Sequence, residues 1–239
     1  MTNAAATMGG ETVIPSAAQR SNIFAQGGFA VFEGLASDLM QRMLLDEAME
    51  RRLSAHENRV AEPDAVEFRG GSPDRCFLSA PGGAAQDSFY LAPALHAALT
   101  RVSGLTVVPT GSRGTYSYYC RAGDFLGLHR DIDTCDLAVI TCLHDGPVSA
   151  ADSGALCLYP DRAREPLSAI RSSPLTGRAL IRLAPGHSIV LLGGIVAHRL
   201  LPVVAGQNRV VSVLCFRAAQ GWPGPAKGRG RDGTMVSAP

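Results

Sequence analysis

Short apolar runs separated by turn-forming residues dominate the second half of the chain. The runs begin near Leu105, and the segments between them include GSRG, RAG, DGP, DSG, LTG and AGQN. Evenly spaced runs bounded by Gly, Asn, Asp and Pro are typical of β-strands joined by tight turns. The pattern predicts a mainly β protein whose strands form a closed or double-sheet architecture.

Helical periodicity and one short strand are expected in the N-terminal half. Residues 29–32 form an apolar run that predicts a strand, and Ser37 is a good N-cap for a helix ending near Leu53. The apolar stripe predicted for this helix comprises Leu39, Met43, Leu44, Ala48 and Met49. The solvated face predicted opposite comprises Asp46, Glu47, Glu50, Arg51 and Arg52. A second helix is expected over residues 93–102, with His96 in a packing or surface role.

Three parts of the chain are expected to lack regular structure. Residues 1–20 and 221–239 are rich in small residues and predict a flexible arm and a flexible tail around one domain at 21–220. Residues 54–88 are rich in Gly, Pro and charge, and their length is more typical of a functional loop or lid than of a simple connection.

Composition excludes several classes of function. The 239-residue chain is 46% hydrophobic and 18% charged, with a formal net charge of +1. This balance gives no electrostatic reason to bind nucleic acid or an acidic membrane surface. The N-terminus lacks a basic segment followed by an apolar one, so it does not resemble a secretory signal. We therefore expect a cytoplasmic protein that acts on a small molecule, with the choice between monomer and homodimer left open.

The six cysteines do not form a metal-binding or disulfide-rich pattern, because they include no CxxC pair. Cys142, Cys157 and Cys215 lie in apolar runs and are interpreted as small buried hydrophobic residues in a reducing compartment. Cys120 and Cys135 lie nearer the candidate site described next, where neither is expected to be a ligand.

His129, Asp131 and His198 form the most informative constellation. The i, i+2 spacing of His129 and Asp131 places both side chains on one face of a strand or its end, and His198 follows Asp131 by 67 residues. Two imidazoles and one carboxylate on one face of an octahedral ion make the facial triad of non-haem Fe(II) oxygenases. The alternative is that His129 pairs with Asp131 in a loop and that His198 is an ordinary half-buried histidine. The apolar strands around both segments favour the metal site.

Residues 116–217 resemble the 2-oxoglutarate/Fe(II)-dependent oxygenases. The segments that carry the resemblance are GDFLGLHRD, LLGGIVAHRLLPV and GQNRVVSVLCFR. They contain the His-x-Asp pair, a distal His, a Pro-Val pair after it, and Arg209, which lies 11 residues beyond His198. Within this superfamily they are similar to small standalone amino-acid hydroxylases and their halogenase relatives. The chain departs from the pattern at Val211, where the family often has Ser or Thr.

The resemblance implies a double-stranded β-helix, or jelly roll, with flanking helices. It also implies Fe(II) bound by His129, Asp131 and His198, with 2-oxoglutarate and O₂ as co-substrates. Arg209 would hold the distal carboxylate of 2-oxoglutarate, with a second hydrogen bond from Tyr116 or Tyr118. In related halogenases the position of Asp131 is Gly or Ala, so the carboxylate here favours hydroxylation.

The expected activity is hydroxylation of an unactivated C–H of a small free substrate, such as an amino acid or a metabolite derived from one. Arg75 and Asp133 are candidate partners of a zwitterion's carboxylate and ammonium, and the alternative is that they are solvated loop charges. Trp222 is a candidate cover for the site. Desaturation and cyclisation use the same iron-based oxidant and stay open. A non-catalytic, cupin-like binding protein is the alternative of a different class.

Overall fold

The computed structural model describes residues 23–111, 114–147 and 150–219. The predicted arm at 1–20, the predicted tail at 221–239 and Trp222 lie outside the described residues. No helix in the described ranges is both long and apolar enough to cross a membrane.

Antiparallel strands account for more of the described chain than helices do. In chain order they are β1 (Phe29–Glu33), β2 (His56–Val60), β3 (Arg75–Pro81), β4 (Val107–Pro109), β5 (Thr115–Tyr119), β6 (Phe125–His129), β7 (Leu137–Gly146), β8 (Leu156–Tyr159), β9 (Ala179–Ile181), β10 (His187–Leu191), β11 (Ala197–Leu200) and β12 (Asn208–Ala218). Hydrogen bonding links them in the order β1-β10-β7-β12-β5-β3-β6-β11-β8-β9, with β2 added to β3 and β4 added to β12.

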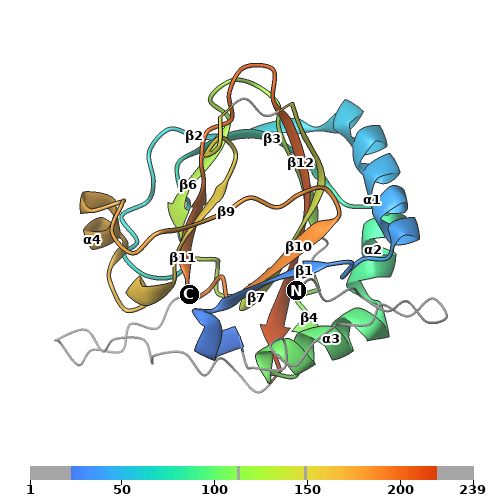
Figure 1. Ribbon diagram of the computed structural model, residues 1–239, viewed down its shortest axis with the longest axis horizontal. Helices are drawn as coiled ribbons and strands as arrows, with labels where there is room; N and C mark the ends of the chain where they lie inside the picture. The colour runs from blue at the N-terminus through green and yellow to red at the C-terminus, as the bar shows by residue number, and fades with distance from the viewer. Residues whose placement is uncertain (1–22, 112–113, 148–149, 220–239) are drawn as a thin grey trace, which may run out of the picture.

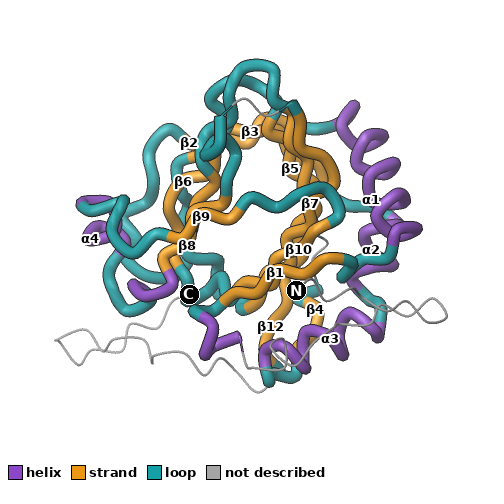
Figure 2. The backbone as a smooth tube through the Cα atoms, in the orientation of Figure 1, coloured by secondary structure: helices purple, strands orange, loops and turns teal. Residues whose placement is uncertain are grey.

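This continuous sheet curls so that its two halves face each other. Figure 2 shows the group containing β7, β10 and β12 on one side and the group containing β6, β8 and β9 on the other, with loops joining them. Curling lets the strands of both halves enclose an interior lined by every second side chain. The architecture is a jelly roll, which confirms the predicted mainly β fold.

Helices cover the outer face of the larger half. They are α1 (Asp38–Arg51), α2 (Ala84–Tyr90) and α3 (Pro93–Ser103), while α4 (Leu167–Ser172) lies beside β6 at the other half, as Figure 1 shows. Short 3-10 turns occupy Ile23–Gln26, Arg52–Ser54 and Pro160–Arg162. The largest apolar core lies between α1, α2, α3 and the outward face of β5, β7 and β12.

The helix predicted from Ser37 is confirmed, since α1 begins at Asp38 and the Ser37 hydroxyl accepts a hydrogen bond from the amide of Met40. Its predicted faces are only partly correct. Leu44 and Ala48 are buried, whereas Leu39, Met43 and Met49 are exposed.

Glu47 was assigned wrongly to the solvated face of α1. Its carboxylate accepts hydrogen bonds from the amides of Gly83, Ala85 and Gln86, at the start of α2. The first amides of a helix have no partner within the helix, so a carboxylate from α1 fills that need. The contact fixes α2 against α1.

The long loop predicted over 54–88 is also partly wrong. It contains β2, β3 and the start of α2, and only the connection from 61 to 74 is irregular. The predicted strand at 29–32 and the predicted helix at 93–102 are confirmed as β1 and α3. His96 has the packing role expected, with its ring edge against Phe216 and its Nε2 near the carbonyl of Tyr90.

Candidate active site

His129 and His198 are direct cross-strand neighbours in the pairing of β6 with β11. Asp131 follows two residues after His129, just beyond the end of β6. Its Oδ1 lies 3.6 Å from the Nε2 of each histidine. One candidate ligand atom from each of the three residues lies within 4.8 Å of the others, so the structure brings the predicted constellation together.

Both imidazoles are oriented by backbone carbonyls. The Nδ1 of His129 donates to the carbonyl of Gly127 at 2.8 Å, and that of His198 donates to the carbonyl of Val196 at 2.9 Å. A carbonyl only accepts, so each Nδ1 carries the proton and each Nε2 presents a lone pair. This arrangement holds a ligating histidine in the correct tautomer and orientation.

Electrostatics support the charge states that a metal ion needs. Burial and, to a lesser extent, the neighbouring His129 lower the pKa of His198 to about 4, so its imidazole is neutral near pH 7. Burial opposes ionisation of Asp131, but His198, His129 and the Arg69 guanidinium hold the pKa of this carboxyl below its usual value. The site therefore presents a neutral His198 imidazole and an ionised Asp131 carboxylate beside His129.

Arg130, the middle residue of the triplet, points away from the candidate ligands. Its buried guanidinium donates to the carbonyls of Ile195, Arg162, Ala163 and Glu165, and more distantly to that of Glu67. Burial lowers its pKa to about 10, which leaves the group charged at neutral pH. Because successive side chains of extended backbone alternate, anchoring Arg130 on one side directs His129 and Asp131 to the other.

Gly193 gives Asp131 the space that it occupies. A Cβ at position 193 would lie 1.7 Å from Asp131 Oδ2, far inside van der Waals contact. The amide of Asp131 also donates to the carbonyl of Gly193 at 2.8 Å. The Gly-Gly bend seen in the sequence before His198 thus has a specific structural reason.

Arg69, from the 61–74 connection, holds the segment that follows Asp131. Its guanidinium donates to the carbonyls of Asp131 and Ile132 and forms an ion pair with Asp136 at 2.8 Å. No sequence motif marks Arg69, because its partners are mostly backbone oxygens of a distant segment.

Cys135 and Cys215 form a disulfide, which corrects the interpretation of Cys215 as a simple buried hydrophobic residue. The bond joins the segment after Asp131 to β12, and Cys135 Sγ lies 3.6 Å from Asp131 Oδ2. Cys142 and Cys157 are free and buried, as expected. A disulfide is more typical of an oxidising compartment than of the cytoplasm, so it does not support the expected localisation.

A pocket extends from the three candidate ligands to Arg209 inside the jelly roll. Its apolar lining includes Phe77, Leu126, Leu156, Leu183, Leu200 and Val211. Besides Arg209 and the ligands, its polar lining comes from Thr115, Ser117 and Tyr119.

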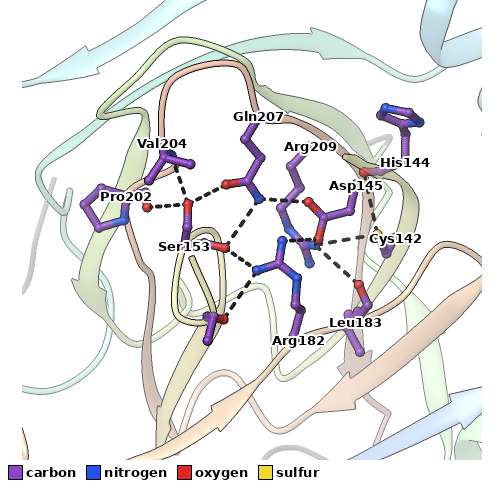
Figure 3. Close-up of polar contacts among 11 residues, drawn as sticks. Cys142, His144, Asp145, Ser153, Arg182, Leu183, Pro202, Val204, Gln207 and Arg209 are labelled. Atoms are coloured by element: carbon purple, nitrogen blue, oxygen red, sulfur yellow. Dashed lines mark hydrogen bonds and ion pairs between the residues drawn. The ribbon is translucent and has the colours of Figure 1, made fainter. Parts of the chain in front are cut away.

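Arg209, on β12, also lines this pocket and is 1% exposed. Its Nη1 donates to Asp145 Oδ2 at 2.7 Å and lies near the carbonyl of Leu183 and the sulfur of Cys142 (Figure 3). Its Nε is buried without a hydrogen-bond partner among the described residues. Arg209 thus lines a cavity while its guanidinium retains an unpaired N–H, which is the feature expected where a carboxylate ligand binds.

Tyr116 and Tyr118 do not join Arg209, so the structure contradicts their predicted role. Their hydroxyls donate to Glu47 and to the carbonyl of Ala48 on α1, on the outer face of β5. Tyr119, one residue later, has the opposite orientation, lines the pocket and pairs with Arg209 across β5 and β12. Burial raises the pKa of Tyr119, so its phenol stays protonated and able to donate.

Arg75 and Asp133, suggested for substrate binding, do not line the pocket. Arg75 donates to Asn58, Ser72 and the carbonyl of Pro73, and these contacts use its guanidinium outside the site. Asp133 is exposed and lies 3.6 Å from Arg69. Both side chains interact with neighbouring loop residues and do not line the pocket.

Comparisons with known proteins agree on the fold. No protein-family model matches the chain, and no curated protein matches it in sequence. Among solved structures, a prolyl-4-hydroxylase from Pseudomonas putida is similar over 82% of this chain and 95% of its own, with a TM-score of 0.56 and 20% identity. HygX from Streptomyces hygroscopicus, solved with nickel and 2-oxoglutarate bound, matches over 82% and 85% with a TM-score of 0.60 and 14% identity.

A third structure of the same fold has a different activity. SnoN, a non-haem α-ketoglutarate-dependent epimerase of nogalamycin biosynthesis, matches over 90% of this chain and 91% of its own, with a TM-score of 0.60 and 14% identity. The chain has the fold of these three structures. At such identities the fold is what the likeness shows, and the chemistry has to be argued from the residues.

Those residues fit an octahedral Fe(II) ion. Two imidazoles and one carboxylate supply three ligands, and the neighbouring pocket leaves room for further ones. Arg209, which lines the same pocket and has an unpaired N–H, fits one carboxylate of a dicarboxylic co-substrate.

Proposed function

We propose that the chain is an Fe(II)- and 2-oxoglutarate-dependent oxygenase that hydroxylates an unactivated C–H of a small free substrate. The observation that carries the proposal is a single pocket lined both by His129, Asp131 and His198 and by the buried guanidinium of Arg209. The three ligands suit the metal ion, and the guanidinium suits the distal carboxylate of 2-oxoglutarate.

Each residue has a distinct task in this mechanism. His129, Asp131 and His198 would hold Fe(II), and Arg209 would bind the distal carboxylate through a charge-assisted pair. The protonated phenol of Tyr119 would donate a second hydrogen bond, in place of the Ser or Thr that Val211 replaces. When bound, Fe(II) and 2-oxoglutarate supply the oxidative chemistry by reducing O₂ to an oxidant able to attack a C–H bond.

The pocket lining suggests what reaches the metal. Phe77, Leu126 and Leu200 are apolar, and the pocket-lining residues that the structure describes contain no cation besides Arg209 and no acid besides Asp131. Apolar walls exclude water and favour a hydrocarbon part of the substrate near the metal. We therefore infer that the reacting portion of the substrate is uncharged, whether or not the whole molecule is an amino acid.

The Asp131 carboxylate favours hydroxylation over halogenation, because it fills the coordination position that a halide would take. Desaturation, cyclisation and epimerisation on a specialised metabolite are the other outcomes of the same machinery. A non-catalytic binding protein would not need three convergent ligands and an unpaired guanidinium in one pocket.

The test is anaerobic reconstitution with Fe(II) and 2-oxoglutarate, followed by exposure to O₂ and measurement of succinate. A panel of free amino acids and apolar carboxylic acids is then screened by mass for a gain of one oxygen atom. Succinate that depends on Fe(II) and disappears in Asp131→Ala supports the proposal. Failure of the folded wild-type chain to bind Fe(II) and 2-oxoglutarate would overturn it.

A further inference from the structure

Arg209 shares its carboxylate partner with a second guanidinium. Asp145 Oδ2 accepts from Arg209 Nη1 at 2.7 Å and from Arg182 Nη2 at 2.8 Å, as Figure 3 shows. The side chain of Asp145 is 3% exposed, and that of Arg182 is 26% exposed. The Arg209 side of the pocket, termed the closed end because the side chains of Arg209 and Asp145 are buried, therefore borders a cluster of two guanidinium cations that share one carboxylate.

These three groups come from separate parts of the fold. Asp145 is on β7 and is the cross-strand neighbour of Arg209 on β12, while Arg182 follows β9. Gln207 donates to Asp145 Oδ1 at 2.9 Å, and Arg182 Nη1 donates to the carbonyl of Ser153 at 2.6 Å. Both oxygens of Asp145 are thus engaged, and the geometry of the cluster is fixed from several sides.

The net charge of this cluster suggests a function for Arg182. Asp145 alone would neutralise Arg209, and a neutral buried pair attracts an incoming carboxylate weakly. Arg182 restores one net positive charge to the cluster. Two guanidinium groups on a single carboxylate oxygen also repel each other, and an anion bound at the free edge of Arg209 would relieve this repulsion.

We propose that Arg182 is a positioning and specificity-determining residue for the co-substrate. Through its ion pair with Asp145, Arg182 keeps a net positive charge at the closed end of the pocket. This charge selects a dicarboxylic 2-oxo acid over a monocarboxylic one. This inference rests on the proposed function and deepens it. Arg182 acts through Asp145 and Arg209 and does not line the pocket itself.

The experiment measures binding and not turnover. The full chain is loaded with Mn(II) and titrated calorimetrically with 2-oxoglutarate and with 2-oxopentanoate, which has the same carbon chain but lacks the distal carboxylate. Wild type, Arg182→Gln and Arg182→Lys are compared. We expect Arg182→Gln to weaken 2-oxoglutarate binding about tenfold, the size of one lost charge interaction in a partly screened site, with 2-oxopentanoate unchanged. Arg182→Lys should recover most of the loss.

A double-mutant cycle separates the charge effect from simple structural support. In an Asp145→Asn background Arg209 has no counter-ion, so Arg182→Gln should cost less there than in the wild type. Equal weakening of both 2-oxo acids by Arg182→Gln, or unchanged 2-oxoglutarate binding, would overturn the role of Arg182 alone. Failure of the Mn(II)-loaded wild type to bind 2-oxoglutarate would overturn the proposed function and this role with it.

Discussion

The two ends of the pocket are built in different ways. At the metal end, His129 and Asp131 are two residues apart, His198 faces His129 directly across a strand pair, and both imidazoles are held by backbone carbonyls close in sequence. At the closed end, Arg209 is held by side chains: Asp145, with Arg182 and Gln207 behind it. The first end depends on local backbone geometry, and the second on a buried charge cluster gathered from distant segments.

This difference predicts which kind of substitution impairs binding at each end. A substitution that fills space next to the backbone should weaken metal binding without changing any charge. A substitution that removes a charge should weaken 2-oxoglutarate binding at the closed end without altering the fold. Independent measurements of metal binding and of 2-oxoglutarate binding in single variants distinguish the two ends.

Gly193→Ala is expected to have the largest effect. The added Cβ would occupy the position of Asp131 Oδ2, so the carboxylate must move and a ligand is lost. Affinity for Fe(II) or Mn(II) should fall on the order of 10³-fold, which corresponds to about 4 kcal/mol. Metal titration monitored by calorimetry, together with circular dichroism to check folding, measures the effect. Metal affinity equal to that of wild type would show that Asp131 does not need this space.

Arg209→Gln should spare the metal end and damage the closed end. Removing the guanidinium eliminates the charge-assisted pair, and we expect 2-oxoglutarate to bind about 10²-fold more weakly. Mn(II) affinity in the absence of 2-oxoglutarate should stay within about twofold of wild type. Arg217→Gln, an exposed arginine on the same strand β12, is the matched control and should change neither value. A similar loss in both variants would remove the assignment of Arg209.

Two tyrosines on β5 give the smallest and most discriminating contrast. Tyr119→Phe should weaken 2-oxoglutarate binding by about fivefold, since one hydrogen bond to a charged group is lost. Tyr116→Phe should leave that binding unchanged but lower the free energy of unfolding by about 1 kcal/mol, because its bond to Glu47 is lost. Calorimetric titration and denaturant unfolding measure the two quantities. The reverse result would restore the role first predicted for Tyr116.

Sequence reasoning reached the metal end because its information is local. The i, i+2 spacing and the apolar strands around His129 and His198 were sufficient to predict the convergence that the structure has. The jelly roll followed from strand spacing together with the family resemblance. Gly193 was visible as part of a bend, but its contact with Asp131 could not be read from a single sequence.

The residues around Arg209 at the closed end could not be predicted from the sequence, for physical reasons. In the segment Tyr116-Ser117-Tyr118-Tyr119, aromatic residues lie on both faces of the strand. The alternation of side chains along the strand therefore could not tell which face points into the pocket. Asp145 precedes Gly-Pro and was read as part of a turn, and Arg182 lies in a connection with no motif. Glu47 was misassigned because its partner, the start of α2, comes from another element.

The disulfide was missed for a similar reason. Cys135 and Cys215 are 80 residues apart in sequence, and only the return of β12 beside the segment after Asp131 brings them together. Connectivity of this kind depends on the fold and not on spacing.

The most direct measurement is anaerobic titration of Fe(II) and then 2-oxoglutarate into the wild-type chain and into Asp131→Ala, with unfolding monitored in parallel. The wild type should bind one Fe(II) per chain and then one 2-oxoglutarate, while the folded variant should lose tight metal binding. Equal, stoichiometric Fe(II) binding by both proteins would contradict the assignment of His129, Asp131 and His198 as the metal site.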